Sequence, residues 1–225
     1  MATGQGYGLK IFPTKKPPHD TEFWSVSTLR SALKRGHRFQ KRDRLWLGVT
    51  LASSVLQLHE TAWLEENWGI DSIFLIERLG TTAYDHFFVS RCFDQASICM
   101  NEAVPRSIAR VIRNQTLFAL GVALIELWYG QTLDELRIPA DDEQSSTTPE
   151  EAALLTRYNI ADRMAEELEF EADVCYSGAV RRCIRCTFDA GINKFNDAKF
   201  RRAVYQGVVM QLQKTYEFTI GHGDS

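Results

Sequence analysis

The sequence predicts a mainly α-helical domain that carries one small β-ribbon. The first observation is segment 114–130, whose large apolar residues recur at helical spacing while most positions between them are apolar too. The run from Leu117 to Tyr129 is too short to cross a bilayer and is interrupted by Glu126, which predicts a buried central helix. The other observations are helix start signals along the chain and two short β-like runs. The periodic apolar residues are Leu117, Leu120, Gly121, Leu124, Ile125 and Trp128.

Composition indicates a soluble, intracellular globular protein. The chain has 225 residues, 44% of them hydrophobic and 24% charged, with a net charge of -3, which suits one large core and excludes global disorder. This charge balance argues against nucleic acid and anionic membrane as partners. No apolar run has the length of a membrane span, and no secretory signal begins the chain. Five cysteines, an odd number, predict reduced thiols in the cytosol or nucleus, and we expect a cytoplasmic protein.

The first half of the chain is predicted to run from a loose arm into two helices. Residues 1–24 form the arm, and the domain itself is expected over 25–216. Ser27 is a plausible N-cap for a short helix that ends near Gly36, and a long helix follows from about Lys41 to Glu60. A dense basic cluster spans these helices, and in an acidic chain we interpret it as a solvated loop and first helical turn rather than an anion site. Its members are Lys34, Arg35, His37, Arg38, Lys41, Arg42 and Arg44.

The chain after residue 60 adds a ribbon and, beyond the central helix, three further helices. Segments 71–76 and 86–90 are rich in β-forming residues and flank a glycine, which predicts a two-stranded ribbon. Residues 134–149 are polar and predict a surface loop, the segment of the chain most prone to disorder. The sequence Thr-Pro-Glu-Glu at 148–151 is a strong helix start. Helices are expected from there to about residue 169, over 176–187 and from 197 to 216, followed by a tail at 217–225.

No motif in the chain specifies an enzyme or a cofactor. Cys183 and Cys186 have the spacing of half a zinc site, but no second pair completes the coordination. The glycines at 4–8 lack the strand and helix that would aim backbone amides at a phosphate. The acidic residues of 166–173 point in several directions at helical spacing, which favours a solvated face. We therefore expect no metal and no cofactor.

The order of the elements resembles the C-terminal lobe of a protein kinase. The short helix, the long helix ending in LASSVLQLHE at 51–60, the ribbon, and ALGVALIEL at 119–127 followed by Gly130 have the order and character of that lobe. Segments 51–63, 88–93, 119–127, 179–188 and 200–209 also look like a fungal family of unknown function. Longer members of that family join the kinase-like region to HeLo-like or prion-inhibition domains. The resemblance covers about residues 25–215 and implies a C-lobe-like fold without an N-lobe.

The groups that move a phosphate in a kinase are missing at the matching positions. The resemblance places Asn67 where the catalytic aspartate would be and Ser72 where a metal-binding asparagine would be. No Asp-Phe-Gly follows the ribbon, and too few residues precede the first helix to form a nucleotide-binding lobe. The sequence therefore predicts degenerate catalytic positions and no catalytic residue.

Two functional hypotheses follow from this resemblance. The first is a non-catalytic, pseudokinase-like interaction or regulatory module, which the resemblance connects with fungal signalling or cell-death and incompatibility pathways. It expects a protein partner or self-association, because a C-lobe without its N-lobe leaves an apolar face to be covered. The second is a divergent kinase or other transferase that needs a partner lobe. The residues expected to contact a partner or cover that face are Phe12, Trp24, Trp63 and Trp68, although their character favours core positions for Trp63 and Trp68.

Overall fold

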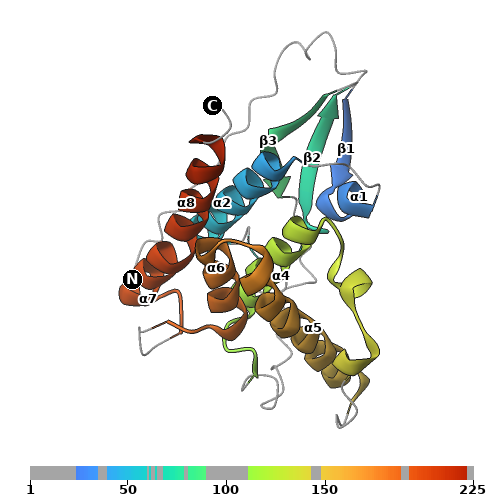
Figure 1. Ribbon diagram of the computed structural model, residues 1–225, viewed down its shortest axis with the longest axis vertical. Coiled ribbons are helices and arrows are strands. Elements are labelled where there is room, and N and C mark those ends of the chain that lie inside the picture. The colour runs from blue at the N-terminus through green and yellow to red at the C-terminus, as the bar shows by residue number, and fades with distance from the viewer. Residues whose placement is uncertain are drawn as a thin grey trace, which may run out of the picture.

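Helices make up most of the described residues, and α4 (Gln115–Tyr129) lies among the other long helices, as Figure 1 shows. The computed structural model describes residues 24–34, 40–59, 61, 64, 68–78, 81–89, 111–142, 148–188 and 193–221. The remaining helices are α1 (Leu29–Lys34), α2 (Lys41–Leu58), α5 (Pro149–Glu171), α6 (Val174–Arg185), α7 (Ala198–Val204) and α8 (Met210–Gly221). The strands are β1 (Trp24–Thr28), β2 (Ile73–Arg78) and β3 (Thr81–Val89). The prediction of a mainly helical domain is confirmed.

Both ends of α4 are set by the residues that the sequence pattern indicates. The Asn114 side chain accepts a hydrogen bond from Leu117 N at 3.0 Å, which satisfies an amide that the first helical turn leaves unpaired. Gly130 ends the helix with φ of 67°, a left-handed conformation that costs glycine little. Every residue from Leu117 to Leu127 is buried, so the helix is enclosed on all sides over most of its length.

Helix α4 packs closely against α2 and α6, and two glycines show how closely. A Cβ atom placed on Gly121 would lie 2.6 Å from Cδ1 of Ile184 on α6. A Cβ atom on Gly48 of α2 would lie 3.0 Å from Cδ2 of Leu124. Because α2 contacts α4 at Gly48 and, near its own N-terminus, at the last turn of α4, the two helices are antiparallel. The first turn of α2 therefore lies beside the last turn of α4.

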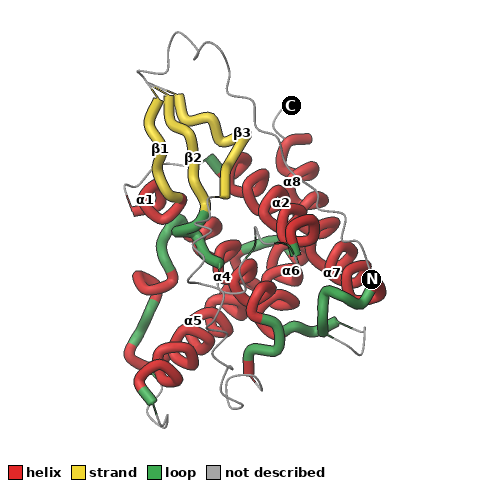
Figure 2. Tube along the Cα trace, turned by 180° about the vertical axis from the view of Figure 1, so that it is seen from behind, coloured by secondary structure: helices red, strands yellow, loops and turns green. Residues whose placement is uncertain are grey.

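A three-stranded antiparallel sheet of order β1-β2-β3 stands at one end of the molecule beside α1 (Figures 1 and 2). Val26 of β1 pairs with Ile76 of β2, and Ile76 pairs with Ala83 of β3. The β2–β3 register shifts between Leu75 and Ile76, which marks a local irregularity. Strands β2 and β3 form the antiparallel ribbon that the sequence predicts, and β1 adds a third strand that it does not.

The start of the first helix differs from the prediction. Ser27 lies within β1, and the α1 cap is Thr28, whose Oγ1 accepts from Ser31 N at 3.1 Å. The segment Trp-Ser-Val-Ser-Thr alternates large or β-branched residues with serines, which suits a strand once β2 offers its hydrogen-bonding edge. Ser27 is thus a strand residue and not a helix cap.

The predicted surface loop 134–149 is partly folded. Its described part forms 3-10 helices at Leu133–Leu136 and Pro139–Asp141, and only 3% of Asp141 is exposed. The Asp141 carboxylate accepts from Arg163 Nη2 at 2.9 Å and from Ile138 N at 2.8 Å. The same Arg163 donates to Leu136 O at 2.7 Å, so one arginine holds this segment against α5. These donors hold the pKa of Asp141 below its usual value.

The helices that begin at Pro149 and Ala198 start where the sequence predicts and extend further, whereas α6, predicted over 176–187, spans Val174–Arg185. Thr148 caps α5 by accepting from Glu151 N at 3.2 Å, and Asp197 caps α7 by accepting from Lys199 N at 2.6 Å. A π-helix at Tyr205–Val209 joins α7 to α8, which continues to Gly221. Residues 217–221, predicted as tail, are therefore helical.

Candidate functional site

The N-terminal end of α4 is the place where the resemblance puts the degenerate catalytic loop. Trp68 is 7% exposed, and its Nε1 donates to Thr116 O on the first turn of α4 at 3.3 Å. Ser72 follows a turn closed by a 2.9 Å bond from its own N–H to Gly69 O. Beside these residues lies a cavity of about 20 Å³, whose other described walls come mainly from the second half of α2. Such a space holds about one water molecule.

The predicted site residues fall into different places. Asn67, Trp63 and Phe12 lie outside the described residues. Trp24 begins β1, but its side chain is not among those described. The burial of Trp68 favours its alternative interpretation as a core residue over the prediction that it contacts a partner.

The pair Cys183 and Cys186, which has the spacing of half a zinc site, is part of the core. Cys183 is completely buried and Cys186 is 2% exposed at the end of α6. Burial raises the pKa of the Cys183 thiol strongly and that of Cys186 to about 11, so both thiols stay protonated and weakly nucleophilic at neutral pH. In the part of the chain that the structure describes, no three His, Cys, Asp or Glu side chains come together as metal ligands.

The predicted acidic face of α5 is largely paired with arginines. Arg185 of α6 reaches Asp162 at 2.5 Å and Glu166 at 2.7 Å, and Arg163 reaches Glu167 at 2.8 Å. These groups are partly exposed, so each pair contributes little to stability. Asp173 has another role, because it caps α6 through the amides of Cys175 and Tyr176.

The C-terminal end of α4 forms a second, open site with the first turn of α2. Arg44 Nη1 donates to Trp128 O at 2.7 Å, and so neutralises part of the negative end of the α4 dipole. The guanidinium lies beside Gly130, where an added Cβ would come within 3.3 Å of Arg44 Nη2. Arg44 is thus positioned by the way α4 ends.

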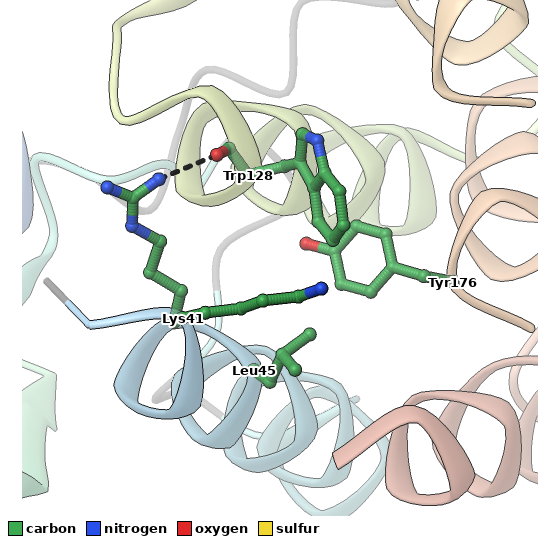
Figure 3. Close-up of a pocket in the computed structure, with 5 residues that line it drawn as sticks. Lys41, Leu45, Trp128 and Tyr176 are labelled. Carbon is green, nitrogen blue, oxygen red and sulfur yellow. Dashed lines mark hydrogen bonds between the residues drawn. The ribbon is translucent and has the colours of Figure 1, made fainter. Parts of the chain in front are cut away.

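Next to this contact is a pocket of about 270 Å³, shown in Figure 3. Lys41 extends from α2 toward Trp128, with its Nζ 5.4 Å from the centre of the indole ring. The Trp128 and Tyr176 rings lie 4.9 Å apart, centre to centre. Leu45 and Tyr176 are almost fully buried and line the interior, while Lys41 is exposed. The pocket therefore has apolar and aromatic walls and a cationic rim.

The polar groups within this pocket already have partners. Tyr176 Oη donates to Leu124 O at 2.8 Å, and burial raises the pKa of this phenol far above its usual value. The Asp173 carboxylate accepts from two α6 amides and from Thr215 Oγ1 at 2.9 Å. The hydroxyl proton of Tyr176 is therefore not available to a ligand in the pocket.

A buried carboxylate lies on another face of α4. Glu126 is 3% exposed, and its Oε1 accepts from Leu133 N at 2.9 Å. Burial raises its pKa to about 7, although the Leu133 hydrogen bond and the charges of Arg157 and Arg30 act in the opposite direction. The sequence shows Glu126 only as an interruption of an apolar run.

The sequence analysis identified several residues that line the pocket, but it did not predict that they meet. Lys41 and Arg44 belong to the basic cluster that we interpreted as solvated, and Trp128 belongs to the apolar face of the central helix. Their meeting depends on the antiparallel packing of α2 and α4. The one sequence signal is a pair of cationic residues spaced i, i+3 on the first turn of a helix. Such a pair does not predict which residues of another helix lie next to it.

The family model described as "Domain of unknown function (DUF7580)" matches residues 12–219. The chain belongs to this family. Neither a curated protein nor a solved structure matches the chain. The DUF7580 match confirms a family of unknown function, whereas the kinase-like, fungal and HeLo-like parts of the prediction stay predictions. Among the described residues of this DUF7580 chain, no helix combines the length and the apolar character needed to cross a bilayer.

Proposed function

We propose that the chain is a non-catalytic, pseudokinase-like module that binds a protein partner and has a regulatory role. The observation that carries the proposal is the filled N-terminal end of α4, where Trp68 and Ser72 border a cavity of about 20 Å³. Small-molecule sites commonly have volumes of roughly 300–1,000 Å³. The small volume at the matching place supports a module without phosphoryl transfer.

The order of the elements also supports this proposal. Helix α2, the β2–β3 ribbon and α4 follow one another as the resemblance implies, and α5, α6 and α8 come after them. Ser72 stands where the resemblance implies a metal-binding asparagine, so the amide oxygen of that residue is missing. By the same resemblance, the setting that we propose is fungal signalling or a cell-death and incompatibility pathway.

Exposed apolar side chains support the binding of a protein. Phe170 is 92% exposed near the end of α5, and Val174 is 84% exposed at the start of α6. Burying a side chain of this size contributes about 1.5–3 kcal/mol, so a partner or a second copy that covered both would gain appreciable free energy.

Thermal denaturation in the presence of ATP and magnesium tests the non-catalytic part of the proposal. We expect the same midpoint with and without MgATP at a concentration far above that of the protein. A ligand present at 100 times its Kd stabilises the native state by about 2.7 kcal/mol, which raises Tm by roughly 5 °C or more in a chain of this size. A saturable rise of that order would instead favour a divergent kinase or other transferase.

Sedimentation velocity over a range of protein concentrations tests the second part. Replacing Phe170 and Val174 with serine should leave Tm within about 1 °C, because both side chains are exposed in the folded chain. Self-association through this junction predicts that the wild-type sedimentation coefficient rises with concentration and that the double variant remains monomeric. If the two proteins sediment alike, this junction does not mediate self-association.

A further inference from the structure

We propose that the pocket between α2, α4 and α6 binds an acidic segment of a partner protein, which inserts one apolar side chain against Leu45, Trp128 and Tyr176. The inference rests on the proposed function and deepens it by assigning the chemistry of the partner. Its basis is the combination of aromatic walls, satisfied interior polar groups and a cationic rim in a pocket of about 270 Å³.

The interior of the pocket selects an apolar group. Leu45 presents only carbon atoms, and Tyr176 has its hydroxyl committed to Leu124 O. A polar group inserted here would lose water without receiving a hydrogen bond from the Tyr176 hydroxyl, which disfavours its burial. The volume lies just below the usual range for small-molecule sites, which favours one anchoring side chain over a nucleotide.

The rim selects negative charge close to that anchor. Lys41 Nζ already lies over the Trp128 ring, so a ligand cation would compete with it and be repelled. The exposed Arg42 adds a second positive charge on the same turn, and Asp43 is the one acidic residue there. The positive end of the α2 dipole points the same way, while Arg44 offsets the negative end of α4. A carboxylate beside the apolar anchor therefore complements this rim.

The experiment selects peptides from a random library displayed on phage, with the 225-residue chain as the immobilised target. The enriched peptides are then synthesised, and their Kd values are measured by fluorescence anisotropy for the wild type and for variants. Lys41→Glu is the main variant, because an acidic first residue suits the helix N-terminus and should preserve folding. The matched control is Lys199→Glu, which makes the same change at an exposed residue in the first turn of α7.

The expected result is enrichment of sequences with Asp or Glu next to one large apolar residue. Lys41→Glu should weaken their binding about tenfold or more, while Lys199→Glu should change it by less than about twofold. Trp128→Ala should also weaken binding about tenfold, because it removes one wall of the pocket. Melting curves for each variant separate lost binding from lost folding, and Lys41→Ala provides a second substitution at the rim.

Three results would overturn the inference, and they are distinguishable from failure of the proposed function. Enriched peptides that bind Lys41→Glu and Trp128→Ala as well as wild type would place partner binding elsewhere and leave the interaction module intact. If no peptides with an acidic residue beside a large apolar residue are enriched, this pocket is not a site for such peptides. Stabilisation by MgATP that disappears in Lys41→Glu would assign the pocket to a nucleotide and would also contradict the non-catalytic proposal.

Discussion

The two ends of helix α4 are built from the same pair of antiparallel helices and yet differ in how they are filled. At the N-terminal end, Trp68 is buried and hydrogen-bonded to Thr116 O, leaving about 20 Å³ of space beside it. At the C-terminal end, Trp128 is partly exposed beside a pocket of about 270 Å³. At the N-terminal end of α4, where the resemblance implies the catalytic positions, the buried Trp68 fills the space. Open space lies at the opposite end of the helix.

The difference has a chemical cause in the residues that α2 presents to each end. The second half of α2 offers Leu51 and Val55, buried apolar side chains that leave only about 20 Å³ of space beside them. Its first turn offers Lys41 and Arg44, whose charged groups stay near solvent while their stems cover apolar surface. Such side chains line a pocket but do not fill it.

The largest expected effect comes from replacing each tryptophan with alanine. Trp68→Ala should lower the free energy of unfolding by about 3–5 kcal/mol, because it opens a cavity in the core and removes the Thr116 hydrogen bond. Trp128→Ala should cost about 1–2 kcal/mol, since the ring is already partly exposed. Urea denaturation measures both values. If both variants lose the same free energy of unfolding, the two ends of α4 do not differ in packing as described.

Replacing the buried carboxylate on α4 gives the next effect, and the size of this effect depends on pH. The Glu126 pKa is about 7 in the folded chain against 4.5 in the unfolded chain, so the folded state binds more protons between these values. This contribution to stability is complete below about pH 4.5 and is lost as pH rises through 7. Glu126→Gln stays neutral while its oxygen can still accept from Leu133 N, so it should exceed wild type in stability by about 1–3 kcal/mol at high pH.

Urea denaturation of wild type and Glu126→Gln at low and high pH checks this prediction. The two proteins should have similar stability near pH 4.5 and diverge as pH rises past 7. Glu217→Gln is a suitable control, because it makes the same change at an exposed residue of α8. A wild-type protein that becomes more stable than Glu126→Gln at high pH would show that the ionised carboxylate is well compensated.

The smallest effects come from the two caps of α4. Asn114→Ala should cost about 1 kcal/mol by leaving Leu117 N without its acceptor. Gly130→Ala should cost a similar amount, because alanine disfavours φ of 67° and its Cβ would approach Arg44. Because Gly130 lies at the pocket end of α4 and Asn114 at the opposite end, we expect Gly130→Ala also to weaken peptide binding about twofold or more. We expect Asn114→Ala to leave peptide binding unchanged. Chemical denaturation and anisotropy measure the two consequences.

The local signals in the sequence predict much of the helical structure. Asn114, Thr148 and Asp197 each occupy the cap position that their side-chain chemistry favours. Strand β1 was missed because a five-residue strand depends on the edge that β2 offers, and no local pattern shows that edge. The burial of Asp141 was missed for a related reason, since its partner Arg163 lies on a different helix.

The candidate site could be predicted only in pieces. The resemblance directed attention to Asn67 and Ser72, and therefore to the end of α4 where the cavity is small. The pocket at the other end requires Lys41, Trp128 and Tyr176 to meet from three helices. Their meeting is decided by close packing at Gly48 and Gly121, which sequence periodicity alone does not specify.

A two-dimensional proton–nitrogen NMR spectrum of the tryptophan indoles tests the contrast between the two ends most directly. The chain has five tryptophans, so single Trp→Phe variants can assign the Trp68 and Trp128 signals. We expect an enriched acidic peptide to shift the Trp128 signal saturably and leave that of Trp68 in place, while MgATP shifts neither. A saturable shift of Trp68 with MgATP, or a Trp128 signal that ignores every bound peptide, would contradict the account.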